Sequence, residues 1–99
     1  MNIQEEKNGD ILTVKPEGRM DTLTSGTLEK YLAERYSGIR QLILDLAGVD
    51  YISSAGLRVL IQAYKKMKEK DGLRLRNVCD QVMEVLESTG YSHVLTIDP

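Results

Sequence analysis

Apolar residues along this chain form two kinds of pattern, short strand-like runs and longer stretches with helical spacing. The strand-like runs lie at 2–7, 11–14, 41–46, 73–78 and 94–97. In three other stretches, apolar residues recur every three or four positions, as they do on the buried face of a helix. These stretches lie at about 21–36, 54–70 and 80–89. The chain therefore predicts the order strand, strand, helix, strand, helix, strand, helix, with a short strand at the end.

This order is typical of an α/β fold with a mixed central sheet of about four to five strands and crossover helices. The turn signal at 8–10 lies between the first two strand-like runs and predicts a hairpin. The run at 41–46 is too continuously apolar to alternate between core and solvent. We expect it to be buried on both faces or central in the sheet.

Several residues indicate where elements begin and end. We expect Pro16 to end the second strand, Gly38 to close the first helix as a left-handed cap, and Asp80 to cap the last helix. In the helix after Ser54, the spacing predicts a buried face that carries Leu57, Leu60, Ile61, Tyr64 and Met67 or Lys68.

Length and composition limit the function classes. The 99 residues predict one domain, 1–99, and the net charge of −2 argues against nucleic acid as a partner. One cysteine, Cys79, and one histidine, His93, do not make a metal-ligand set, and no nucleotide-binding glycine pattern is present, so we expect no metal and no cofactor. The absence of a signal-peptide pattern and of a membrane-length apolar run predicts a cytoplasmic protein. No exposed apolar face stands out, which predicts a monomer.

Ser53 and Ser54 lie where the run at 41–46 and its acidic loop lead into a helix. In open α/β sheets, functional groups collect at the carboxyl ends of strands, where the next helix begins. A serine at this place can cap the helix by accepting a hydrogen bond from a free backbone N–H group. It can also carry a phosphate, because a helix N-terminus favours negative charge. The residues alone favour the cap, and the two roles are compatible.

Three stretches carry a resemblance to a known family, the STAS domain of the anti-sigma factor antagonist type. Gly18-Arg19-Met20-Asp21, followed by Thr24 and Leu28, resembles the family's Gly-x-φ-Asp motif, where φ is apolar. Leu42-Ile43-Leu44-Asp45-Leu46, with Val49 and Ile52, resembles its central strand and loop. Ser53-Ser54-Ala55-Gly56-Leu57 resembles its Asp-Ser-Ser/Thr-Gly-Leu signature. The order of strands and helices agrees from end to end, so the resemblance covers the whole chain.

The resemblance implies a protein-interaction switch rather than an enzyme. In that family, the first serine after the aspartate is phosphorylated by the anti-sigma factor, which is itself a serine kinase, and the matching position here is Ser54. The unphosphorylated protein would bind the anti-sigma factor and free a sigma factor, and a PP2C-type phosphatase would reset the phosphoprotein. The docking surface would be formed or bordered by Asp21, Thr24, Ser53, Ala55, Gly56, Leu57 and Arg58.

Two positions depart from the family pattern. Ser53 stands where the family usually has an aspartate, and Ala55 replaces the second hydroxyl residue. The first change removes a negative charge and adds a hydroxyl, so Ser53 is a second candidate for phosphorylation. Ser54 remains the first candidate, because it keeps the family's spacing from Gly56 and Leu57.

Two other functions stay open at this point. The same fold can serve as a STAS subunit that braces a membrane transport ATPase from the cytoplasmic side without being phosphorylated. A small serine hydrolase is a remote alternative, since a nucleophile elbow would need a glycine where Ile52 stands, and nothing in the sequence places His93 beside Ser54.

Basic residues are concentrated between Arg58 and Arg76, a stretch that contains seven Lys and Arg but only two Asp and Glu. The simplest interpretation is a solvated helix face followed by an exposed strand face. The functional alternative is a rim that steers the protein toward an acidic protein partner. Tyr64 is the only aromatic residue among these cations, which disfavours nucleic acid.

Overall fold

A mixed five-stranded sheet forms one layer of the molecule in this computed structural model, which describes all 99 residues. The strands are β1 (Asn2–Asn8), β2 (Ile11–Glu17), β3 (Gln41–Asp45), β4 (Gly72–Arg76) and β5 (Thr96–Ile97), and they lie side by side in that order. β1 and β2 pair antiparallel, whereas β2 to β5 pair in parallel. The predicted α/β class, the hairpin and the central place of β3 are confirmed.

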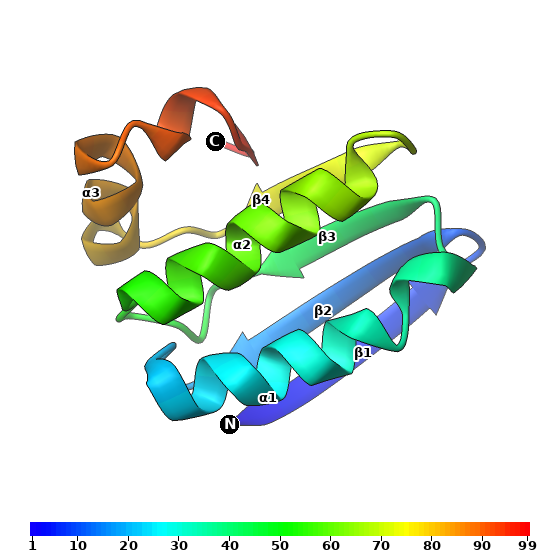
Figure 1. The fold of residues 1–99 in the computed structure, drawn as a ribbon, viewed down its shortest axis with the longest axis horizontal. Coiled ribbons are helices and arrows are strands. Elements are labelled where there is room, and N and C mark those ends of the chain that lie inside the picture. Colours follow the sequence, from blue (N-terminus) through cyan, green and yellow to red (C-terminus); the bar gives the residue numbers. More distant parts are fainter.

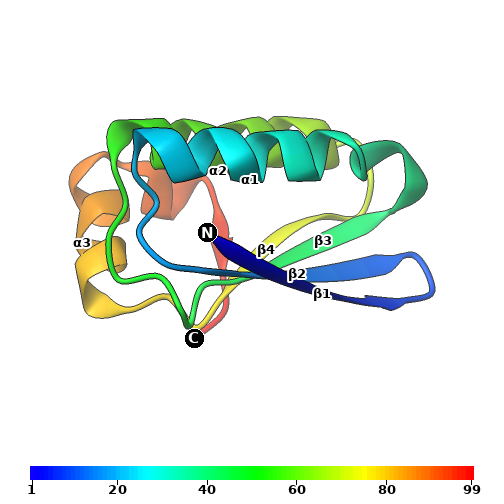
Figure 2. The same cartoon turned by 90° about the horizontal axis from the view of Figure 1, so that it is seen from below.

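The helices form a second layer on one face of this sheet. The helices α1 (Thr22–Ala33) and α2 (Ser54–Met67) lie side by side across it, while α3 (Asp80–Ser88) sits at one end of the molecule (Figures 1 and 2). Two short 3₁₀ turns complete the chain, η1 (Tyr36–Gly38) and η2 (Tyr91–His93). The opposite face of the sheet carries no helix (Figure 2).

The core lies between the sheet and the two covering helices. Alternate strand residues point into it, namely Leu12, Val14, Leu42, Leu44, Leu73 and Leu75. Ile43 points to the open face, yet it is only 8% exposed, because the strand register places Thr13 and Arg74 on either side of it. A central strand can therefore be continuously apolar even where only one face of its sheet is covered by helices.

The predicted ends of the first strands and helix need correction. β2 continues through Pro16 to Glu17. Proline has no N–H group, but the pairing of β2 with β3 already stops at Val14, so the proline removes no hydrogen bond to β3. α1 ends at Ala33, earlier than predicted. Gly38 ends the η1 turn instead of capping α1, and its φ is not positive.

Three boundaries in the second half also differ from the prediction. β4 ends at Arg76, because Asn77 adopts a left-handed conformation with φ of 57°. Cys79 holds the N-cap position of α3, and Asp80 is the first helical residue, where its charge suits the helix dipole. The last strand is only two residues long, because the backbone N–H groups of Val94 and Leu95 turn back to the carbonyl oxygen of Tyr91.

Candidate functional site

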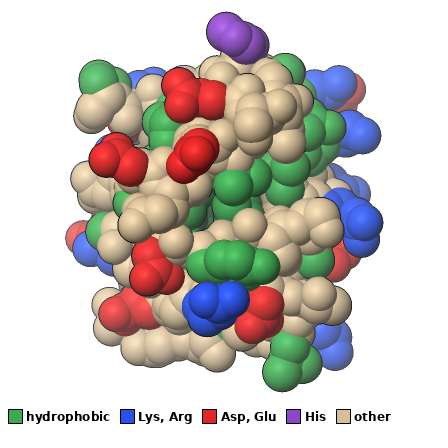
Figure 3. Space-filling model, turned by 90° about the vertical axis from the view of Figure 1, so that its left-hand side faces the viewer, with side chains coloured by type: hydrophobic (Ala, Val, Ile, Leu, Met, Phe, Trp, Pro, Cys, Tyr) green, Lys and Arg blue, Asp and Glu red, His purple; other side chains and the backbone are tan.

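The segment that enters α1 and the segment that enters α2 are joined side by side by backbone hydrogen bonds. The N–H of Gly18 donates to the carbonyl oxygen of Gly48 at 3.0 Å, and the N–H of Met20 donates to that of Tyr51 at 2.9 Å. In the opposite direction, the N–H of Ser53 donates to the carbonyl oxygen of Met20 at 2.8 Å. These bonds bring the N-termini of both helices to one end of the molecule, which faces the viewer in Figure 3.

Two glycines allow this close approach. A Cβ atom on Gly56 would lie 2.9 Å from the carbonyl oxygen of Met20 and 2.9 Å from Cγ1 of Ile52. A Cβ atom on Gly48 would lie 2.8 Å from Cγ of Glu17. Contacts this short do not occur without displacement of one partner, so the sequence holds glycine where the two segments touch.

Asp21 and Thr24 form a reciprocal cap at the start of α1. The Oδ1 atom of Asp21 accepts hydrogen bonds from the N–H groups of Leu23 at 3.1 Å and Thr24 at 3.0 Å. In return, the N–H of Asp21 donates to Oγ1 of Thr24 at 3.0 Å. The bonds from Thr24 hold the pKa of the Asp21 carboxyl below its ordinary value. Asp21 therefore presents a negative charge beside the entry to α2.

The two serines at the entry to α2 have different environments. Ser53 is the N-cap, half-buried, and its Oγ accepts a hydrogen bond from the N–H of Gly56 at 3.2 Å. Ser54 is the first residue of the helix, is exposed, and its hydroxyl makes no hydrogen bond within the protein. The capping role and the accessible hydroxyl are thus divided between two neighbouring residues.

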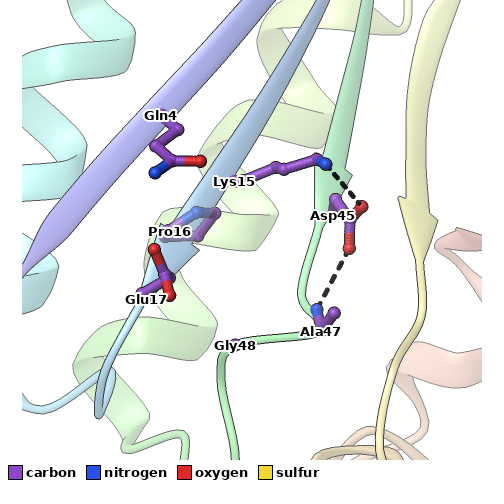
Figure 4. A pocket seen from close by; sticks show the side chains of 7 residues that line it. All are labelled: Gln4, Lys15, Pro16, Glu17, Asp45, Ala47 and Gly48. Atoms are coloured by element: carbon purple, nitrogen blue, oxygen red, sulfur yellow. Dashed lines mark hydrogen bonds and ion pairs between the residues drawn. The ribbon is translucent and has the colours of Figure 1, made fainter.

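A buried carboxylate at the end of β3 fixes the loop that leads to these serines. Oδ1 of Asp45 accepts hydrogen bonds from the N–H of Ala47 at 3.1 Å and from Nδ2 of Asn77 at 3.0 Å, and Oδ2 lies 4.0 Å from Nζ of Lys15. Figure 4 shows Asp45 between the Lys15 and Ala47 contacts, beside Gly48. Sequence reasoning assigned no role to Asn77. An asparagine directly after a strand is the signal that could have suggested a left-handed residue there.

A shallow hollow lies directly beside Ser54. Its volume is about 230 Å³, and it is lined by Ser54, Leu57, Arg58, Ile61 and Tyr91. The predicted buried face of α2 is partly wrong at this place. Leu57 and Ile61 are only half-buried, as is Tyr64, whereas the deeply buried face carries Val59, Leu60, Ala63 and Met67.

Arg19 and Tyr51 add an exposed contact between the two entry segments. The guanidinium carbon of Arg19 lies 3.9 Å from the centre of the Tyr51 ring, a cation–π arrangement, and that ring is 39% exposed. The structure thus gathers the predicted residues Asp21, Thr24 and 53–58 at one end, and it adds the Arg19–Tyr51 pair, which no sequence pattern predicts.

The histidine predicted to lie apart from the serine pair does so. His93 is exposed in η2 and makes no hydrogen bond to Ser53 or Ser54, so no nucleophile and base are paired. No group of three or more His, Cys, Asp or Glu side chains is placed to hold a metal ion. No helix has the length and apolar character that a membrane crossing requires. What the arrangement offers is the exposed hydroxyl of Ser54 at the start of α2.

Comparison with known proteins shows the family of this chain. The family model of the STAS domain matches residues 2–99. The chain belongs to the STAS domain family. Among curated proteins, a Bordetella bronchiseptica protein named as an anti-sigma factor antagonist, BtrV, is 32% identical over 99 residues, which cover 98% of this chain and 85% of the relative. The resemblance to anti-sigma factor antagonists inferred from the motifs is confirmed.

Solved structures of anti-sigma factor antagonists share the fold. An anti-sigma factor antagonist from Mycobacterium paratuberculosis superposes with a TM-score of 0.89 at 21% identity, over 99% of this chain and 85% of that one. The phosphorylated form of the Bacillus cell fate determinant SpoIIAA superposes with a TM-score of 0.76 at 12% identity, over 99% of this chain and 92% of that one. At these identities, the likeness establishes a common architecture.

Proposed function

We propose that this STAS domain is a phosphorylation-controlled anti-sigma factor antagonist with Ser54 as the acceptor. The unphosphorylated form binds an anti-sigma factor that is also a serine kinase, and the sigma factor is thereby released. Phosphorylation of Ser54 abolishes the binding, and a PP2C-type phosphatase restores it. The name of the Bordetella relative supports the antagonist role, and SpoIIAA, which shares the fold, exists in a phosphorylated form.

The observation that carries this proposal is the contrast between the two serines. Ser54 has an exposed hydroxyl with no partner in the protein, so a kinase can reach it without opening the helix. Ser53 uses its hydroxyl to cap α2, and a phosphate there would displace the bond from the N–H of Gly56. Ser54 is therefore our choice, and Ser53 is the second candidate.

The surroundings of Ser54 support an interface at which a single phosphate can prevent binding. Asp21, Thr24 and Ser53 border it on one side, and Ala55, Leu57 and Arg58 follow it along α2. A phosphate adds a charge of about −1.5 to −2 at the centre of this surface, which a partner would have to accommodate. Gly56 is buried, so we assign it the role of bringing the two segments together rather than that of touching a partner.

On this proposal, the protein acts in the cytoplasm as a monomer and is the substrate of an enzyme rather than an enzyme itself. It needs no cofactor and no metal. Its partners are the anti-sigma factor kinase and the phosphatase, with no nucleic acid and no membrane insertion.

The test is to map the phosphorylated residue. We expect wild-type protein incubated with a candidate anti-sigma factor kinase and ATP to gain one phosphate on Ser54, as located by mass spectrometry. Ser54→Ala should gain none. Ser53→Ala is the matched control, because it removes the neighbouring hydroxyl and the cap, at a cost of about 1 kcal/mol of stability, and should still be phosphorylated. Phosphate on Ser53, or unchanged labelling of Ser54→Ala, would show that the acceptor is wrongly assigned.

A further inference from the structure

The hollow beside Ser54 has the composition of a small docking surface. Three of its five lining residues, Leu57, Ile61 and Tyr91, offer apolar surface, one is the cation Arg58, and none is a carboxylate. Figure 3 shows hydrophobic side chains gathered on this end of the molecule, with Lys and Arg side chains along one edge of them. Apolar anchors beside a charged rim are the usual composition of protein–protein interfaces.

The apolar side chains are only half-buried because of the way the helices are arranged. α1 packs along one flank of α2, whereas α3 sits at the end of the molecule and leaves the other flank of α2 without a neighbouring helix (Figure 1). Leu57, Ile61 and Tyr64 follow one another along that flank at three- and four-residue spacing.

The charge along this flank points to the chemistry of the partner. Arg58 and Lys68 are both exposed, and neither of them forms an ion pair. The cations that do have carboxylate partners lie elsewhere, on the sheet, just after α1 or in the turn before β3. Unpaired cations beside apolar anchors are complementary to a segment that carries both apolar and acidic side chains.

We propose that the hollow receives an acidic amphipathic segment of the anti-sigma factor. An apolar side chain of that segment fills the space between Leu57, Ile61 and Tyr91, and a carboxylate pairs with Arg58. This inference rests on the function proposed above and extends it, because it names the part of the surface that the partner uses and the chemistry of the partner segment.

Arg58 also connects this surface to the phosphorylation of Ser54. The two residues lie four positions apart on α2, so their side chains are neighbours on the helix, and both line the hollow. A phosphate on Ser54 is a stronger acceptor for the guanidinium than a carboxylate of the partner, because it carries more charge and three oxygen atoms. Phosphorylation therefore takes Arg58 away from the partner and places a like charge beside the partner's acidic groups.

Binding measurements with matched variants test the surface. The probe is the kinase identified by phosphosite mapping, titrated without ATP against each variant by calorimetry. We expect Arg58→Glu and Ile61→Ser to weaken the association by about tenfold or more, and we expect the wild-type affinity to fall as salt is added. Lys66→Glu makes the same change of charge on the flank of α2 that faces α1, and should change the affinity by less than about twofold.

The phosphate itself reports the pairing with Arg58 in the absence of any partner. In the phosphoprotein, ³¹P NMR titration should give a lower second pKa for the Ser54 phosphate in wild type than in Arg58→Gln, because the guanidinium favours the dianion. Circular dichroism checks that each variant is folded. If the wild type binds the kinase and is phosphorylated, but Arg58→Glu and Ile61→Ser bind equally well, the docking surface is wrong and the proposed function stands. If no anti-sigma factor binds the wild type, the proposed function fails, and this inference fails with it.

Discussion

At the residue scale, Gly56 determines how closely the entry to α2 approaches the entry to α1. Its missing side chain leaves room for the carbonyl oxygen of Met20, which accepts the hydrogen bond from the N–H of Ser53. Ser53 can then cap α2, and Ser54 follows as an exposed residue on a fixed helix turn. The position of the candidate acceptor thus depends on a buried neighbour.

The two glycines of α1 and α2 make a matched prediction. Gly56→Ala should lower the free energy of unfolding by roughly 1–3 kcal/mol, because its Cβ would press on the backbone of Met20. Gly26→Ala, in the interior of α1, should raise it by about 0.5–1 kcal/mol, since nothing lies within 4 Å of that Cβ and alanine favours the helix. Urea unfolding measures both. If both variants lost a similar amount of unfolding free energy, the packing argument would be contradicted.

At the scale of elements, Asp45 joins three of them at the end of the sheet. It ends β3, bonds to the N–H of Ala47 in the loop before α2, and bonds to Asn77 in the loop before α3. Asn77 can make this contact because its left-handed backbone turns the chain away from β4. The loop that carries the serines is therefore held at its base as well as along its length.

The Asp45 contacts predict a local change in hydrogen exchange. Asp45→Ala should speed the exchange of the Ala47 amide and lower the free energy of unfolding by about 1–3 kcal/mol, because that amide has no backbone acceptor. Asp45→Asn keeps an oxygen at the same place and should leave the amide largely protected. Equal exchange rates at Ala47 in both variants would show that the carboxylate does not hold the loop.

The elements of this fold could be predicted from the sequence where neighbouring residues determine them. The packing of these elements against one another could not be predicted. The run at 41–46 and the serine pair after it contain the strand, the loop and the cap within a few residues. The buried face of α2 was only partly predicted, because helical spacing does not reveal which flank α1 covers, and Val59 is buried while Leu57 stays half-exposed. The bond from Asp45 to Asn77 spans 32 positions, so only the folded chain brings it about.

At the scale of the whole molecule, polar and short edges protect the sheet while one end remains open to a partner. The edge strand β1 carries Glu5, Glu6 and Lys7, and the opposite edge strand β5 is only two residues long. Charged or short edge strands resist pairing with a second sheet, which favours the proposed monomer. The flank of α2 opposite α1 belongs to the helix layer, so a partner can bind there without pairing with a strand (Figures 1 and 2).

If phosphorylation acts on the surface alone, charge at position 54 should change binding and leave the fold intact. Ser54→Asp should unfold within about 2 °C of wild type, because Ser54 is exposed and a negative charge is favourable at a helix N-terminus. Ser54→Lys is the matched control with the opposite charge, and should be less stable than Ser54→Asp by about 0.3–1 kcal/mol. Thermal unfolding followed by circular dichroism measures both. A Ser54→Asp variant that unfolds well below Ser54→Lys would mean that the charge disturbs the fold itself.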